Sequence, residues 1–342
     1  MAELLHLSSL SSLEKIPATA LPEFSPPPRF HETHFESYRP QHPSQGLARQ
    51  FTETFIGQMR VAERFRWPWQ KSRQGKGLYL DGGFGVGKTH LLASAYHASP
   101  EAAKAYLSFQ ELVYLIGVLG MATAKEELGH TALLCIDEFE LDDPGNTLIV
   151  KTFLAYVFEQ GGSVITTSNT PPEALGRGRF NASDFAREIQ SIAQHFEVVP
   201  IDGPDYRHRD HLAGLFGERE LEDLIEREES FWPKLEAGWG ELFAFLESVH
   251  PIRYRDLLSR VGILYLRGVD TIPDQNSALR FVHFIDKLYD LNVGLRASGE
   301  IPLAELYHPS YRNSAYTKKH FRSLSRLSEL LEEPHRLQPD VI

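Results

Sequence analysis

A glycine-rich loop followed by lysine and threonine is the most informative chemical pattern in this sequence. It has the spacing Gly-x-x-x-x-Gly-Lys-Thr, beginning at Gly82. Glycines let backbone N–H groups point inward at an anion, and a helix that begins after the loop adds its positive N-terminal end. Lys88 is expected to reach the β- and γ-phosphates of a nucleotide, and the Thr89 hydroxyl to bind Mg²⁺. The residues predicted to contact the nucleotide are Gly82, Gly83, Phe84, Gly85, Val86, Gly87, Lys88, Thr89 and His90.

Two carboxylates and an amide follow later strands. Asp137 and Glu138 come directly after the apolar run 132–136, and Asn169 ends the run 161–169. Asp137 would orient the Mg²⁺, and Glu138 would polarise the water that attacks the γ-phosphate. Asn169 could hydrogen-bond the γ-phosphate or that water, although it could also be a turn residue before two prolines. Together these residues predict a hydrolytic site for ATP.

Phosphoryl transfer also needs positive charge against the developing transition state. The candidate residues are Arg177, Arg179, Arg187, Arg207 and Arg209. Arg179 lies in a glycine-rich segment and is our choice for a finger offered to a neighbouring subunit, which would require a homo-oligomer. The residues alone do not rank these arginines.

The elements that must position these groups alternate between apolar runs and helical patterns. Such alternation is typical of an α/β fold with a parallel sheet covered by helices. We predict a flexible N-terminal arm with an aromatic anchor at 1–43, a P-loop ATPase core at 44–210 and a C-terminal α/β region at 211–342. In the last region, 217–229 is predicted to be an acidic helix, and the aromatic residues Trp232, Trp239, Phe243 and Phe245 are expected on helical segments.

The C-terminal region repeats part of the core at an offset of 130 residues. The apolar run 132–136 maps onto 262–266, and Ser168 maps onto Ser298. The groups with predicted chemistry are lost in this second copy, where Arg267, Gly268 and Gly299 stand in their places. A degenerate repeat and a chance similarity of two helix–strand units are both compatible with the pattern.

Composition excludes several classes of protein. A formal net charge of −11 disfavours a chain whose main role is to wrap nucleic acid. The last predicted helix is basic on one side and could meet an anionic partner or only solvent. The single Cys135, expected in a buried strand, excludes an intramolecular disulfide. No apolar run approaches the roughly 18 residues of a membrane span, and secretory features are missing at the N-terminus, so a cytoplasmic protein is expected.

The motifs resemble those of the ZapE family of AAA+ ATPases, bacterial cell-division proteins related to mitochondrial Afg-type ATPases. The resemblance begins near Pro28 and includes the glycine-rich loop. Its other matching segments are Tyr38-Arg-Pro, Leu134-Cys-Ile-Asp-Glu-Phe139, Thr167-Ser-Asn-x-Pro-Pro-Glu173, Asp205-Tyr-Arg-x-Arg209 and Ser298-x-Glu-x-Pro302. The chain departs from many relatives at 180–185, where they carry a Gln-Arg-x-Arg-Phe segment.

The resemblance implies an AAA+ P-loop fold, Mg²⁺-dependent ATP hydrolysis in the cytoplasm and peripheral association with the division machinery. It also implies interaction with the tubulin-like protein FtsZ. Two alternatives remain open: a helicase-loader-like AAA+ protein, which the overall acidity disfavours, and a non-hydrolysing nucleotide switch, which Glu138 disfavours.

Overall fold

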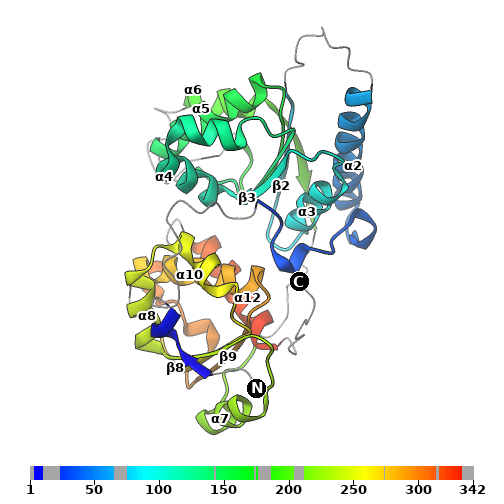
Figure 1. Cartoon of the computed structure of the whole chain (residues 1–342). Coiled ribbons are helices and arrows are strands. Elements are labelled where there is room, and N and C mark those ends of the chain that lie inside the picture. Colours follow the sequence, from blue (N-terminus) through cyan, green and yellow to red (C-terminus); the bar gives the residue numbers. More distant parts are fainter. Residues whose placement is uncertain are drawn as a thin grey trace. The chain divides into compact units, whose positions relative to one another are not determined.

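The chain folds into two compact units, each built on its own parallel sheet (Figure 1). The first unit comprises Leu21–Pro26 and Phe30–Tyr206, and the second comprises Met1–Ala20, Pro27–Arg29 and Arg207–Ile342. The computed structural model describes residues 4–10, 24–64, 75–141, 144–172, 175, 186–203, 212–272, 274–312 and 316–332. None of the described helices is long and apolar enough to cross a membrane.

The sheet of the first unit has the strand order β3-β4-β5-β2-β6, and all neighbouring strands are parallel. Its strands are β2 (Gly77–Gly82), β3 (Lys104–Ser108), β4 (Leu133–Asp137), β5 (Ser163–Ser168) and β6 (Phe196–Ile201). Its helices are α2 (Pro43–Arg64), α3 (Lys88–Ala98), α4 (Phe109–Leu128), α5 (Pro144–Glu159) and α6 (Ala186–Ala193). Parallel strands need a crossover between them, and the helices that follow β2, β3 and β4 supply it.

Helices cover both faces of this sheet because successive strand residues point to opposite sides. Tyr79 and Leu134 face a core shared with α4, α5 and α6. Leu78 and Cys135 face the other core, shared with α2 and α3. The burial of Cys135 in a strand confirms the prediction, and burial raises the pKa of its thiol.

The second unit has the strand order β1-β7-β8-β9, again with parallel neighbours. Its strands are β1 (Leu4–His6), β7 (Lys234–Gly238), β8 (Ile263–Val269) and β9 (Gly294–Gly299). Its helices are α7 (Glu218–Arg227), α8 (Trp239–Ser248), α9 (Tyr254–Leu258), α10 (Gln275–Asp290), α11 (Pro309–Arg312) and α12 (Thr317–Glu332).

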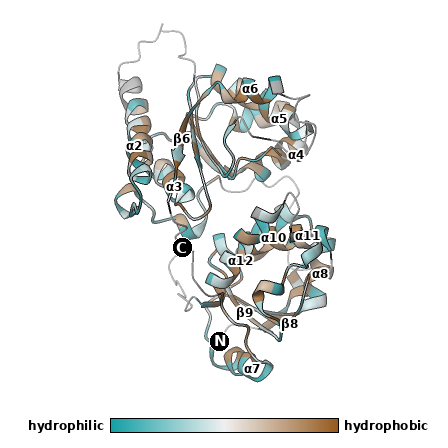
Figure 2. Cartoon of the chain, turned by 180° about the vertical axis from the view of Figure 1, so that it is seen from behind, coloured by the Kyte–Doolittle hydropathy of each residue, from teal (hydrophilic) through white to brown (hydrophobic). Residues whose placement is uncertain are grey.

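The two faces of the second sheet are unequally covered. The large core lies between the sheet and the helices α8, α9, α10 and α12. On the other face Ile263 and Tyr265 pack against Leu221 of α7. Both α10 and α12 carry hydrophobic and hydrophilic residues along their length (Figure 2), as expected of helices with one buried face.

Two local predictions differ from the structure. Residues 4–6, expected in a flexible arm, form β1 at the edge of β7, and Leu7 and Leu10 are buried in the large core of the second unit. Trp232, expected on a helical segment, lies before β7 and outside the helices, whereas Trp239, Phe243 and Phe245 lie on α8. The chain enters a strand after Trp232 because pairing with β8 overrides local propensity.

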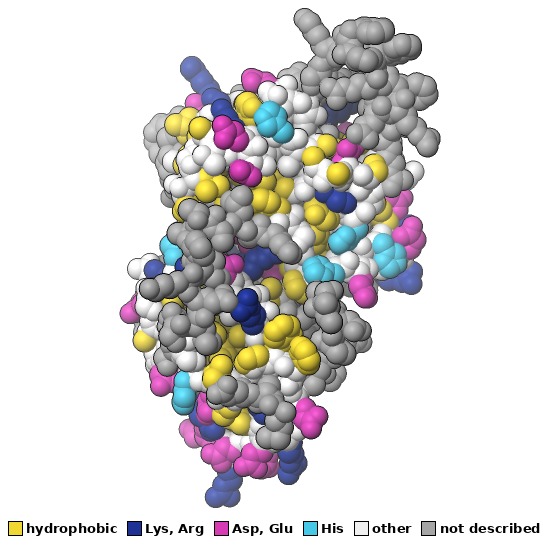
Figure 3. Space-filling model, viewed as in Figure 1, with side chains coloured by type: hydrophobic (Ala, Val, Ile, Leu, Met, Phe, Trp, Pro, Cys, Tyr) yellow, Lys and Arg dark blue, Asp and Glu magenta, His cyan; other side chains and the backbone are white. Residues whose placement is uncertain are grey.

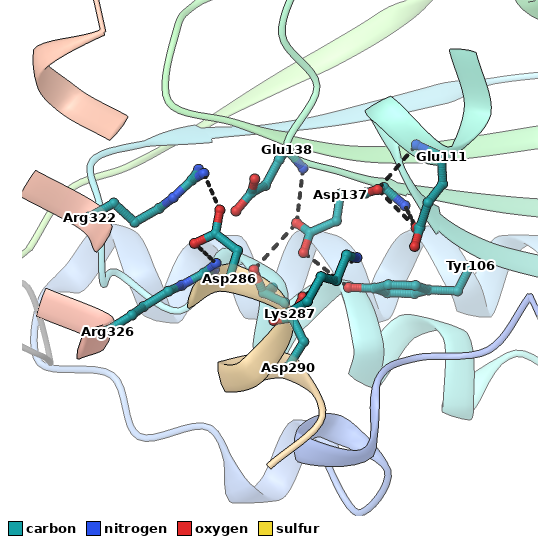
Figure 4. A network of polar contacts seen from close by, with 11 residues as sticks. Tyr106, Glu111, Asp137, Glu138, Asp286, Lys287, Asp290, Arg322 and Arg326 are labelled. Atoms are coloured by element: carbon teal, nitrogen blue, oxygen red, sulfur yellow. Dashed lines mark hydrogen bonds and ion pairs between the residues drawn. The ribbon is translucent and has the colours of Figure 1, made fainter. Parts of the chain in front are cut away.

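The basic side of the last helix has an internal partner. In the second unit, Arg322 of α12 donates to the Asp286 carboxylate of α10 at 2.6 Å, and Arg326 is ion-paired with the same carboxylate (Figure 4). All three side chains are buried. A buried carboxylate needs such partners, so this cluster joins α10 to α12.

Candidate active site

The glycine-rich loop joins β2 to α3, as predicted. Gly85 and Gly87 have φ angles of 66° and 88°, in the left-handed region that glycine adopts without a penalty. A Cβ on Gly82 would lie 2.2 Å from the carbonyl oxygen of Ile201, and one on Gly87 would lie 2.4 Å from the ring of Tyr38. The glycines are therefore required by packing as well as by backbone conformation.

Lys88 is the first residue of α3, and its ammonium lies against the loop. Nζ donates to the carbonyl oxygens of Gly82 and Gly83, the former at 2.8 Å. It also donates to Oδ1 of Asn169 at 2.8 Å, so two predicted site residues meet. The Lys88 side chain is buried. A cation held between the loop and the end of β5 is placed to receive phosphate oxygens.

The segment before α2 supports the loop from outside. The Tyr38 hydroxyl donates to the carbonyl oxygen of Val86 at 2.7 Å. Nε2 of His90, predicted to contact nucleotide, lies 2.9 Å from Oγ of Ser37. Burial lowers the pKa of His90, ahead of the opposing hydrogen bond with the His34 carbonyl. The His90 imidazole is therefore engaged by residues 34–37.

Asp137 ends β4 and gathers donors from three other elements. Its Oδ1 accepts from the hydroxyls of Thr89, at 3.3 Å, and Thr167, and from the backbone N of Glu138 at 3.1 Å. Its Oδ2 accepts from the Tyr106 hydroxyl at 3.2 Å (Figure 4). These donors fix the orientation of the carboxylate next to the start of α3.

Glu138 has a backbone conformation that is rare for a residue with a side chain. Its φ is 54°, in the left-handed region. Its backbone N donates to Oγ1 of Thr167 at 3.0 Å, and the next residue, Phe139, donates to the Thr167 carbonyl at 2.7 Å. Conformations of this kind cost about 1–3 kcal/mol and persist where the surroundings impose them, frequently at functional sites. β5 therefore holds the Glu138 backbone in place.

The predicted arginines are not joined to this cluster. Arg187 lies exposed on α6. Arg177, Arg179, Arg207 and Arg209 lie outside the described residues, so the prediction for Arg179 stays a prediction.

The oxygen donors of the site fit Mg²⁺. Among the described residues no group of three or more His, Cys, Asp or Glu could hold a metal by itself. Mg²⁺ does not need such a group, because it keeps several waters and is bound by one or two protein oxygens together with substrate phosphates. The Thr89 hydroxyl and the Asp137 carboxylate are hard donors that hydrogen-bond each other beside the loop.

Three functional contacts escaped the sequence analysis. Tyr106 and Thr167 both bind Asp137, and Tyr38 binds the loop. A signal existed for Thr167, because it lies two residues before Asn169 at the same polar strand end. Tyr106 is in the middle of an apolar strand, where only the register against β4 reveals its role.

Comparison with known proteins gives matches in sequence and in structure. A model of the AFG1-like ATPase family matches residues 19–241 and 242–336. The chain is 27% identical over 300 residues to the cell division protein ZapE of Escherichia coli strain K12, covering 76% of this chain and 79% of that protein. It is 27% identical over 157 residues to the lactation elevated protein 1 homolog B of Danio rerio, covering 40% of this chain and 31% of that one.

Among solved structures, DnaI has a TM-score of 0.42 at 21% identity and covers 52% of this chain and 93% of its own. The replication initiator DnaA bound to AMPPCP and single-stranded DNA has a TM-score of 0.39 at 14% identity. The match covers 87% of this chain and 88% of that one.

Proposed function

The chain belongs to the AFG1-like ATPase family, and we propose that it hydrolyses ATP with Mg²⁺ to regulate the bacterial cell-division machinery. The observation that carries the enzymatic part is the convergence of Lys88, Thr89 and Asp137 at the carboxyl end of one parallel sheet. Ligands of open α/β sheets bind at this end of the strands. The division role is supported by the 27% identity to ZapE.

Binding of the triphosphate is assigned to the loop and Lys88. The backbone N–H groups around Gly85 and Gly87 would receive phosphate oxygens, and the N-terminus of α3 would add its dipole. Lys88 would exchange a loop carbonyl for a phosphate oxygen while Asn169 keeps its ammonium in place.

The acidic residues take separate roles. Thr89 and Asp137 would hold Mg²⁺, which when bound supplies positive charge against the phosphate oxygens. Glu138 would accept a proton from the attacking water, and its imposed backbone conformation would position the carboxylate for that role. The charge on the transition state would be met by Lys88 and, from a neighbouring subunit, by Arg179.

The cellular context follows from the similarity to ZapE and is part of the proposal. The protein would act in the bacterial cytoplasm as a homo-oligomer, and it would associate peripherally with division proteins such as FtsZ. Nucleic acid is not expected as its partner, because the formal net charge is −11.

Steady-state ATPase assays test both parts of the proposal. Turnover is measured for the protein alone, with FtsZ polymers and with single-stranded DNA. Stimulation by FtsZ polymers is expected, whereas stimulation by DNA alone would replace the division role with a helicase-loader-like one. Binding of a fluorescent ATP analogue is measured in parallel for each variant.

Two variants locate the activity. Lys88→Ala is expected to lose nucleotide binding, and Glu138→Gln to bind ATP while losing turnover. Glu197→Gln, at an exposed position on β6, is the matched control and should retain both. Full ATPase activity in Lys88→Ala would contradict the assignment of ATP binding to this loop.

A further inference from the structure

We infer that residues 212–299 are a second copy of the nucleotide-binding fold, in which an ion pair between Glu218 and Arg267 replaces the phosphate- and metal-binding groups. The inference concerns the second unit alone and does not rest on the proposed function. It predicts that this unit binds no nucleotide, because Glu218 and Arg267 bind each other at the position where a ligand would be held.

Matching elements recur 130 or 131 residues apart along the chain, and the larger distance applies from α5 and α10 onward, so that β9 begins 131 residues after β5. β7 lies 130 residues after β3, with the same length, and the first residue of α7 lies 130 residues after that of α3. The helices after β3 and β7 also begin alike. The backbone N of Ser108 donates to Glu111 at 2.7 Å, and that of Gly238 donates to Glu241 at 2.8 Å. The repeat thus extends to the way in which the helices are capped.

Three strands of each sheet repeat in order and direction, and the first pair also repeats in register. β3-β4-β5 and β7-β8-β9 are both parallel, and the pairing of Lys104 with Leu133 recurs as that of Lys234 with Ile263. In both sheets the helices between these strands lie on one face, while α3 or α7 lies on the other. Two unrelated helix–strand units would not be expected to share all of these features.

In each copy a partly buried lysine at the start of a strand binds the C-terminal end of the preceding helix. Lys104 donates to the carbonyl oxygens of Tyr96 and Ser99, at 2.8 and 3.0 Å, where α3 ends. Lys234 donates to the carbonyl oxygens of Ile225 and Glu228, the latter at 3.0 Å, where α7 ends. Each lysine satisfies carbonyls that a helix leaves without an internal partner.

A left-handed residue recurs at the central strand. Glu138 directly follows β4, and Gly268 lies at a register shift within the last residues of β8. Gly268, at the position equivalent to Glu138, has a φ of 67°, against 54° for Glu138. Its backbone N donates to Oγ of Ser298 on β9 at 3.3 Å, as that of Glu138 donates to Thr167 on β5. The left-handed conformation is kept, and its cost is removed because glycine has no Cβ.

At the positions equivalent to the phosphate and metal site of the first unit, the signs of the charged side chains are reversed. Arg267 stands at the position of Asp137, Glu218 at that of Lys88 and Glu236 at that of Tyr106. Arg267 donates to Glu218 at 3.0 Å and to Glu236, so a strand-end cation now binds the helix and the neighbouring strand.

Glu218 is an exposed residue that places a carboxylate of the chain at the start of α7. Its carboxylate accepts from Ser298 and Arg267, and the Ser298 hydrogen bond is the main reason that the pKa of Glu218 is lowered. Glu222 lies 3.7 Å from Arg267, and acidic side chains gather over this helix (Figure 3). A nucleotide phosphate at this position would meet carboxylates in place of a lysine, and repulsion would exclude it.

Two measurements on the full-length protein test the inference. Native mass spectrometry with an ATP analogue is expected to give one equivalent per chain in the wild type and none in Lys88→Ala. Hydrogen exchange is then followed in peptides covering α7 and β8 for Glu218→Gln, Arg267→Gln and the double variant. Each single change is expected to speed exchange there by roughly twofold to fivefold, and the double change by less than the product of the two.

Arg49→Gln is the matched control, because it breaks an ion pair with Glu53 on α2 in the first unit and should leave α7 unchanged. Nucleotide bound to Lys88→Ala, or unchanged exchange in Arg267→Gln, would overturn the inference. If the wild type bound no nucleotide, the proposed function would fail, while the exchange data would still decide whether the ion pair closes the second site.

Discussion

The ends of β4 and β8 show how little of this fold is needed to make or remove an active site. Both strands lie between two parallel neighbours. A left-handed residue follows β4 at Glu138, and another interrupts β8 at Gly268. At the first, Asp137 accepts from three hydroxyls, whereas at the second Arg267 donates to carboxylates. Packing and capping keep the architecture, and a few strand-end side chains decide the chemistry.

Glu138 and Gly268 also differ in the conformational free energy of their left-handed backbone. Glu138 adopts a conformation that only glycine adopts freely, and Gly268 adopts it without strain. Strained backbone conformations are frequent at functional sites. The presence of glutamate where the second unit has glycine therefore supports a functional role for the Glu138 side chain. The second unit, without that need, carries the residue that the backbone prefers.

The largest expected difference between the two units lies in activity. Asp137→Asn should lower ATP turnover on the order of 100-fold, because a metal ligand and the centre of a hydrogen-bond cluster lose their charge. Arg267→Gln, the equivalent change in the second unit, should leave turnover per folded molecule unchanged. Initial rates against Mg²⁺ concentration measure both. A similar loss in both variants would mean that the second unit takes part in hydrolysis.

The next expected effect should be shared by both units. Lys104→Met and Lys234→Met each remove an ammonium that satisfies two helix-end carbonyls, and each should cost about 1–2 kcal/mol of local stability. Hydrogen exchange at the ends of α3 and α7 measures the two costs. Loss of protection in only one of them would show that the lysines are alike in geometry but not in energy.

A smaller effect should separate the partners of the two strand ends. Tyr106→Phe removes one neutral donor from Asp137 and should reduce turnover only a few-fold, with a free-energy cost of about 1 kcal/mol. Its counterpart Glu236→Gln removes a charge from Arg267 and should act on exchange in β7 and β8, not on turnover. Turnover unaffected by Tyr106→Phe would mean that the remaining donors suffice to orient Asp137.

The smallest expected effect depends on pH and belongs to the second unit. The pKa of Glu218 is lowered from 4.5, mainly by the Ser298 hydroxyl and also by Arg267. Its contribution to stability is fully present above pH 4.5 and is lost as pH falls through the folded-state pKa. Glu218→Gln should therefore flatten the fall of the unfolding midpoint between pH 5 and pH 3, roughly the window of that titration. An unchanged slope would show that the carboxylate is not coupled to folding.

Much of the first site could be predicted because its elements are local or share one sheet edge. The loop, Lys88 and Thr89 are contiguous, and the carboxyl ends of parallel strands bring Asp137 and Asn169 to the same side. The strand β7 was not predicted between Trp232 and Trp239, because the state of a five-residue strand depends on its neighbours in the sheet more than on its own sequence.

The sequence by itself determined that this chain has one phosphate-binding loop, acidic strand ends to accompany it, and a second half without those groups. Each is a matter of residue type at a fixed spacing, which the chain carries wherever it folds. Only the tertiary structure decided that Tyr106 and Thr167 converge on Asp137, and that Glu218 meets Arg267. Those pairings join distant positions through strand register and helix packing, which no local pattern specifies.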